Sequence, residues 1–217
     1  MIFPLRALLQ RRGLPIVTLL LIAANIYFFL YELSFPIWLR DRFIEHYALV
    51  PDRIAPVTLL TSMFLHGGWL HLIGNMWFLW VFGSHIEDAM GPVKFAAFYL
   101  IGGVASAGVQ FVISAGSPIP VIGASGAIAG IMGAFLMLYP RVRVVCLVFI
   151  VIFVTTIDLP AAFMLVYWFI LQVLSGLGSL SSITQAQGVA WFAHVGGFLA
   201  GVFLTRVFQD NRRRYLY

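Results

Sequence analysis

Charged residues are scarce in this sequence. Only 10% of its 217 residues are charged, and 62% are apolar. Soluble domains usually carry charges at about a quarter of their positions. The composition therefore excludes a water-soluble globular protein, and it excludes a disordered chain, which needs low hydrophobicity and high net charge. An integral membrane protein with most of its length in lipid remains.

Cysteine and the common cofactor motifs are also nearly absent. The single cysteine, Cys146, rules out an intramolecular disulfide framework and a multi-cysteine metal site. The sequence has no H-E-x-x-H zinc motif, no glycine-rich phosphate loop and no dinucleotide fingerprint. We therefore expect no metal and no cofactor. The net charge of +5 does not indicate a nucleic-acid partner, because the positive residues gather beside the apolar segments.

Six apolar segments predict the membrane spans. A helix needs ~20 mainly apolar residues to cross a ~30 Å hydrocarbon core. The candidates are 14–33, 69–86, 92–113, 124–139, 160–178 and 189–208. The apolar, β-branched stretch 144–157 is too short to span, so we expect it to be buried or interfacial and to lead into the fifth helix. The sequence thus predicts an all-α membrane protein, a bundle of six transmembrane helices over 14–208.

The distribution of lysine and arginine predicts the orientation. Six spans place both termini on one side of the membrane, and ten of the 13 Lys and Arg residues fall on that side. Because positive residues are enriched in cytoplasmic loops, residues 1–13 are predicted to be a cytoplasmic segment and 209–217 a basic cytoplasmic tail. A seventh span at 144–157 would move Arg206 and the basic tail outside, and would place His194 near the wrong face.

Polar groups inside a span are costly and often functional, and the predicted spans contain few of them. His71 and Asn75 are in the second span, Ser125 opens the fourth, and His194 is in the sixth. At ~1.5 Å of rise per residue, Ser125 and His71 lie ~24 Å, and His194 ~18 Å, from the cytoplasmic ends of their spans. We therefore expect Ser125, His71 and His194 to lie at one level, several Å below the outer surface of the membrane.

The fourth span is short, so residues 118–123 must dip into the protein. Irregular backbone at that depth is tolerated only where protein buries it or where it lines a water-filled cavity. Two glycine pairs, Gly126 with Gly130 and Gly197 with Gly201, would let the fourth and sixth helices pack closely. This packing would bring the Ser125 hydroxyl within reach of the His194 imidazole.

A serine paired with a histidine suits nucleophilic catalysis. The histidine takes the hydroxyl proton, and fixed donors stabilise the tetrahedral oxyanion. His71 and Asn75 are spaced i, i+4 and share a helix face; with the Ser125 backbone N–H at a helix N-terminus they predict an oxyanion hole. No acidic partner for the histidine is evident, so a Ser–His dyad is the simplest arrangement. The absence of a mid-span aspartate argues against an aspartyl protease.

Three motifs resemble those of the rhomboid family of intramembrane serine proteases. They are His66-Gly-Gly-Trp-Leu-His71-Leu-Ile-Gly-Asn75, Gly123-Ala-Ser125-Gly126 and Ala193-His194-Val-Gly-Gly197, in the family's order. The similarity covers about residues 56–208 and implies six helices around a water-accessible cavity.

By this resemblance, Ser125 is the nucleophile and His194 the base, while Gly123 and Gly126 shape the loop around the serine. Glu87 has a structural role. The fifth helix, about 160–178, moves to admit a substrate helix from the lipid.

The predicted function is therefore an intramembrane serine endopeptidase whose partners are the lipid bilayer and transmembrane protein substrates. An inactive rhomboid-like scaffold that binds transmembrane helices is one alternative. A transporter is another, although the sequence shows no convincing internal repeat. Because no large soluble extension is present, we expect a multi-pass protein of a prokaryotic plasma or inner membrane.

Overall fold

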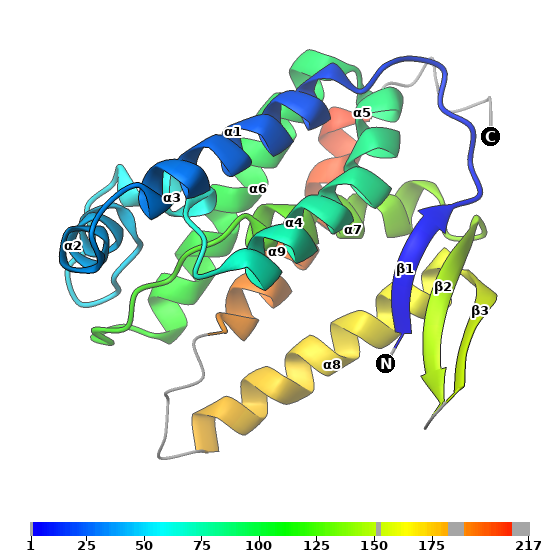
Figure 1. The fold of residues 1–217 in the computed structure, drawn as a ribbon. Coiled ribbons are helices and arrows are strands. Elements are labelled where there is room, and N and C mark those ends of the chain that lie inside the picture. Colours follow the sequence, from blue (N-terminus) through cyan, green and yellow to red (C-terminus); the bar gives the residue numbers. More distant parts are fainter. Residues whose placement is uncertain (1, 151–152, 182–188, 210–217) are drawn as a thin grey trace.

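The computed structural model describes residues 2–150, 153–181 and 189–209, and helices dominate them (Figure 1). The helical elements are α1 (Ile16–Leu33), α2 (Ile37–Tyr47), α3 (Thr58–Thr61), the 3-10 turn η1 (Ser62–Phe64), α4 (Trp69–Phe78), the π-helical segment η2 (Leu79–Gly83), α5 (Ser84–Met90), α6 (Pro92–Ile113), α7 (Ser125–Leu138), α8 (Ala161–Ser181) and α9 (Trp191–Phe208). The strands are β1 (Ile2–Ala7), β2 (Arg143–Ile150) and β3 (Phe153–Pro160).

Each of the six segments predicted as a span is helical. The second segment corresponds to α4, η2 and α5, which follow one another without a break. Within the described residues, four helices are long and apolar enough to cross a membrane: α1, α6, α8 and α9. Helix α7 is apolar but has only 14 residues, so the fourth segment is short, as its sequence indicates.

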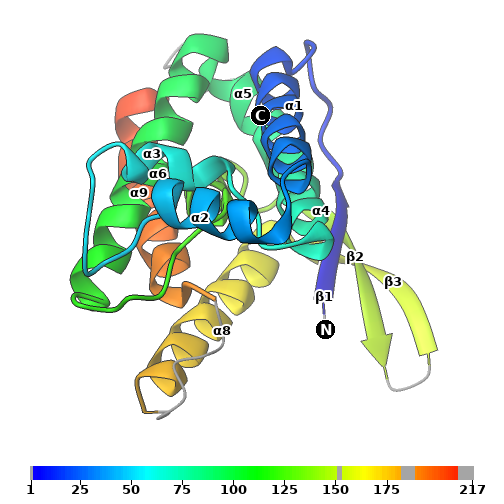
Figure 2. The same cartoon turned by 60° about the vertical axis from the view of Figure 1, so that its left-hand side comes forward.

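The prediction of an all-α fold is wrong in one region. Residues 143–150 and 153–160 form the antiparallel strands β2 and β3, and β1 pairs antiparallel with β2 to complete a three-stranded sheet. Valine, isoleucine and threonine fit the pleated surface of a strand, and a stretch too short to cross the membrane can pair its backbone groups this way. Figures 1 and 2 show the sheet near the start of α8, with β2 and β3 pointing away from the helices.

One of the two segments predicted to flank the membrane domain contributes to the sheet. Strand β1 lies within the predicted cytoplasmic segment 1–13, and the Trp77 side chain of α4 donates a hydrogen bond of 2.7 Å to the Pro4 carbonyl. Cys146 is fully buried in β2. Residues 151–152 of the stretch 144–157, and all but Gln209 of the predicted tail 209–217, lie outside the described residues.

Glycines let α7 and α9 touch backbone to backbone. Every residue of α7 from Gly126 to Phe135 is buried. A Cβ atom built on Gly197 would overlap the carbonyl oxygen of Gly126, and one built on Gly201 would overlap that of Gly130. The distance between the two helices is therefore set by main-chain atoms, which is how small-residue pairs act in membrane helices.

The start of α1 is tied to α5 by Glu87. The carboxylate of this buried residue accepts the backbone N–H of Val17 at 2.9 Å, and both the N–H and the hydroxyl of Thr18 at 2.7 Å. A negative charge at a helix N-terminus satisfies unpaired donors and interacts favourably with the helix dipole. Glu87 thus joins two helices and takes no part in the polar cluster described below.

Candidate active site

Ser125 and His194 meet where α7 and α9 begin. Ser125 is the first residue of α7, and His194 lies in the first turn of α9. The serine hydroxyl is 2.8 Å from the imidazole Nε2. Both side chains are partly exposed. The close packing of the glycine pairs brings the two residues together, and the arrangement suits transfer of the hydroxyl proton to the ring.

The other ring nitrogen of His194 contacts a residue that the sequence reasoning missed. Its Nδ1 lies 2.7 Å from the amide oxygen of Gln172, a buried residue of α8. When Nδ1–H donates to this oxygen, the proton is on Nδ1 and the Nε2 lone pair faces Ser125. The signal that could have found Gln172 is the one that found the others: a strongly polar side chain inside a predicted span.

His71 and Asn75 lie beside the loop that leads into Ser125. A methyl group on Gly123 would be 2.7 Å from His71 Nε2 and 3.5 Å from Asn75 Nδ2, so both side chains pack against this glycine. The φ of Gly123 is +118°, which L side chains rarely adopt. Glycine is therefore needed here for two reasons, the backbone conformation and the approach of His71.

The Ser125 backbone N–H opens α7, so it has no acceptor within its own helix. It is two residues from Gly123, against which His71 and Asn75 pack. The structure thus gathers three donors near the serine, from α4 and from the start of α7. Donors grouped in this way can stabilise a negative charge that develops on an oxygen bound next to the nucleophile.

A buried histidine forms a hydrogen bond with Asn75. His66, in the loop before α4, has no exposed surface, and its Nε2 accepts a hydrogen bond of 3.0 Å from Asn75 Nδ2. Burial, together with the neighbouring His71, lowers the pKa of His66 to about 4, so its ring is neutral at neutral pH. The His66 backbone N–H donates to Glu32 of α1 at 3.3 Å. These contacts fix the loop and the Asn75 amide together.

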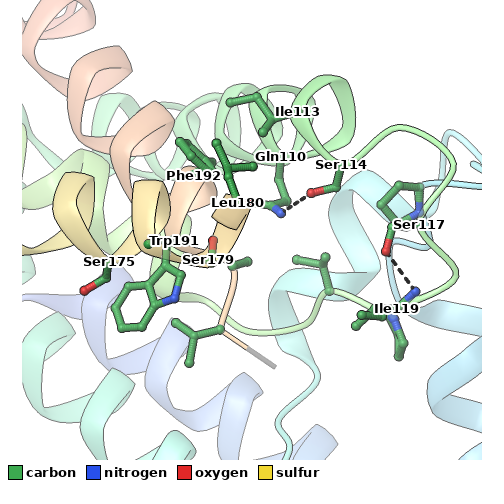
Figure 3. Close-up of a pocket in the computed structure, with 16 residues that line it drawn as sticks. Gln110, Ile113, Ser114, Ser117, Ile119, Ser175, Ser179, Leu180, Trp191 and Phe192 are labelled. Carbon is green, nitrogen blue, oxygen red and sulfur yellow. Dashed lines mark hydrogen bonds between the residues drawn. The ribbon is translucent and has the colours of Figure 1, made fainter. Parts of the chain in front are cut away.

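A cavity of about 420 Å³ lies at the start of α9, whose first turn also contains His194 (Figure 3). It is enclosed by the ends of α6 and α8, the start of α9 and the loop before Ser125, and much of its wall is polar. The polar lining residues are Gln110, Ser114, Ser117, Ser175 and Ser179. Ser125 and His194 do not line it; along the chain it comes nearest to them at Phe192, two residues before His194.

Gln110 connects this cavity to the start of α9. Its amide oxygen accepts the backbone N–H of Ala193 at 2.9 Å, and its amide nitrogen donates to Ser114 Oγ at 2.7 Å (Figure 3). The Ser106 hydroxyl donates to the Ala193 carbonyl at 2.7 Å. The residue before His194 is therefore held on both its backbone groups by α6, and the wall of a polar cavity adjoins the site.

Comparison with known proteins gives one family. Residues 55–211 match the model of the Rhomboid domain. The mitochondrial presenilin-associated rhomboid-like protein of Homo sapiens is 28% identical over 193 residues, which are 84% of this chain and 46% of that protein. RHOMBOID-like protein 7 of Arabidopsis thaliana is 32% identical over 148 residues, which are 67% of this chain and 41% of that protein. The chain thus spans less than half the length of these relatives.

The comparisons confirm the resemblance and overturn the expected location. The prediction of a prokaryotic plasma or inner membrane is wrong, because the relatives are eukaryotic: the vertebrate ones are mitochondrial by name, and others are from a plant. The prediction rested on the absence of a soluble extension, which carries no information about the organism. The lysine and arginine pattern distinguishes the two sides of a membrane but does not identify the membrane.

Proposed function

The chain belongs to the rhomboid family, which includes intramembrane serine proteases as well as inactive members, and on this premise we propose that it is an intramembrane serine endopeptidase. Its substrates are transmembrane proteins, cut in or near their membrane segments. The observation that carries the proposal is the contact of 2.8 Å between Ser125 Oγ and His194 Nε2.

The proposed reaction passes through an acyl-enzyme. Ser125 Oγ attacks the carbonyl carbon of the scissile peptide while His194 Nε2 takes the hydroxyl proton. The resulting oxyanion is stabilised by the Ser125 N–H and by His71 and Asn75. When the tetrahedral intermediate collapses, the C–N bond breaks and His194 gives its proton to the leaving amine. A water molecule, deprotonated by His194, then hydrolyses the ester and restores the serine.

The membrane arrangement belongs to the same proposal. We place six spans in the bilayer, formed by α1, the continuous α4–α5 segment, α6, α7, α8 and α9, with both termini on the cytoplasmic side. The even number of spans and the ten-to-three distribution of positive residues support this orientation. The membrane domain is then 14–208, between the segments 1–13 and 209–217, and the substrate helix enters beside α8.

Cleavage of a transmembrane reporter by the purified protein in detergent tests the proposal. Wild type should cut the reporter, and Ser125→Ala and His194→Ala should not. Ser84→Ala serves as a matched control, because the hydroxyl of this buried serine of α5 donates to the Trp80 carbonyl of the preceding η2 segment, and its loss should leave cleavage intact. Equal cleavage by wild type and Ser125→Ala would refute the assignment. If wild type neither cleaves nor reacts with a serine-directed probe, the scaffold alternative holds.

A further inference from the structure

We propose that Gln172 is a positioning residue for the dyad: from α8, its amide oxygen holds the Nδ1–H of His194 and so presents Nε2 to Ser125. This inference rests on the proposed function, and it adds a third member, from a third helix, to the pair expected from the sequence. The three side chains form one line of contacts, with 2.7 Å from Gln172 to His194 and 2.8 Å from His194 to Ser125.

The Gln172 amide is buried, so it must find its hydrogen-bond partners within the protein. The residue is only 7% exposed, and a buried polar group that loses its hydrogen-bond partner destabilises the protein. One turn earlier on α8, the Trp168 ring lies 6.0 Å from the His194 ring, at an interplanar angle of 35°. Two side chains of α8 therefore lie beside the imidazole, the Trp168 ring and the Gln172 amide.

The chemical role follows from the tautomer. A neutral imidazole carries one proton, and the nitrogen without it is the base. An acceptor at Nδ1 keeps the proton there, leaves Nε2 able to take the serine proton, and fixes the ring plane. An amide oxygen does this without adding a charge. Gln172 touches no reacting atom, so its effect on the reaction passes through His194.

The position of α8 then controls the base. Helices α7 and α9 are held together by main-chain contacts at their glycines, so the Gln172–His194 hydrogen bond is the link in this line that depends on where α8 lies. When α8 moves outward to admit a substrate, the ring loses its acceptor. His194 is oriented again once α8 returns to α9, which couples completed substrate entry to activation of Ser125.

Three variants of α8 separate positioning from packing. Gln172→Met keeps the length of the side chain and removes the oxygen, whereas Gln172→Glu keeps both the length and an oxygen acceptor. Leu174→Met is the control, since Leu174 is 59% exposed on the outer side of the same helix. We expect Gln172→Met to lower kcat for the reporter at least about tenfold, since positioned general bases contribute ~10²–10⁴, with KM within about twofold. Gln172→Glu should stay within about fivefold of wild type, and Leu174→Met should match it.

The rate at which a fluorophosphonate labels Ser125 distinguishes a failure of this inference from a failure of the proposed function. It depends on activation of the hydroxyl and requires no peptide substrate, so it should fall with Gln172→Met even for a protein that cuts no reporter. Wild-type labelling without cleavage would count against the peptidase and leave the role of Gln172 measurable. A Gln172→Met labelling rate within twofold of wild type, or a Gln172→Glu variant as slow as Gln172→Met, overturns the inference. Should Gln172→Met fail to fold, Gln172→Leu carries the same comparison.

Discussion

Adding one methyl group between α7 and α9 should separate the nucleophile from the base. In Gly197→Ala the new Cβ would overlap the carbonyl oxygen of Gly126. That oxygen belongs to the backbone one residue after Ser125 and cannot rotate away. The helices must then move apart by about 1 Å to restore a normal van der Waals contact. The distance between Ser125 Oγ and His194 Nε2, which is 2.8 Å in the structure, would increase beyond hydrogen-bonding range.

Alanine substitutions at different glycines of the same interface should lower kcat by different amounts. A displacement of ~1 Å can cost ~10²-fold in rate, so we expect kcat for reporter cleavage to fall about 100-fold in Gly197→Ala. In Gly130→Ala the Cβ would lie 3.2 Å from the Gly197 carbonyl oxygen, which requires a shift of only a few tenths of an ångström. Its kcat should fall less than about tenfold.

The control for these variants is Gly102→Ala in α6. Gly102 is also buried, but its Cβ would meet nothing within 4 Å, so kcat should stay within about twofold of wild type. The measurement is kcat with the transmembrane reporter, accompanied by the labelling rate of Ser125 with a fluorophosphonate. If Gly197→Ala and Gly130→Ala are equally active, the backbone contact does not set the geometry of the dyad, and the reasoning fails.

Two further predictions concern stability. Glu87→Gln removes the negative charge that accepts three hydrogen bonds from Val17 and Thr18, so it should destabilise the protein by about 1–3 kcal/mol while kcat of the folded protein stays within about twofold; an unchanged melting temperature would contradict this role. Burial lowers the pKa of His66 from 6.5 to about 4, so the unfolded chain binds this proton at a higher pH than the folded one. Stability present above about pH 6.5 should therefore be lost as the pH falls toward 4, by an amount on the order of 3 kcal/mol. Thermal melts across this range should fall more steeply for wild type than for His66→Gln, and parallel slopes would refute the assignment.

The helices and the polar cluster could be predicted because both depend on local or additive properties. Apolar length gives the spans, and the rise per residue gives the depth of each polar group. Counting residues along three separate spans thus predicted that Ser125, His71 and His194 lie at one level. The structure places the hydroxyl of Ser125 against the imidazole of His194 and packs His71 beside the loop that precedes the serine.

The sheet could not be predicted in the same way. Strand β1 pairs with β2 although Ile2 and Val148 are 146 positions apart in the sequence. Such pairing depends on non-local contacts that no apolar run reveals. A β-branched composition and insufficient length for a span were visible in 144–157, but its partner strand was not.

Gln172 was missed for a different reason. Its polarity was visible in the predicted fifth span, but an amide carries no charge and belongs to no motif at that position. Glu32 lies near the end of the first predicted span, and its contact with the backbone of His66 depends on how the loop before α4 folds. Partners supplied by another helix or by a loop become evident only when the elements are packed.

The contact between the glycine pairs divides α7 and α9 into two kinds of surface. On the inner side, main-chain atoms touch, and one added carbon changes the spacing of the reacting groups. On the outer side of α9, large side chains such as Phe203 and Val207 are 70% and 75% exposed, and they take no part in this main-chain contact. The exposed face of α9 can therefore change with the surroundings of the protein, while the distance between the Ser125 hydroxyl and the His194 imidazole stays the same.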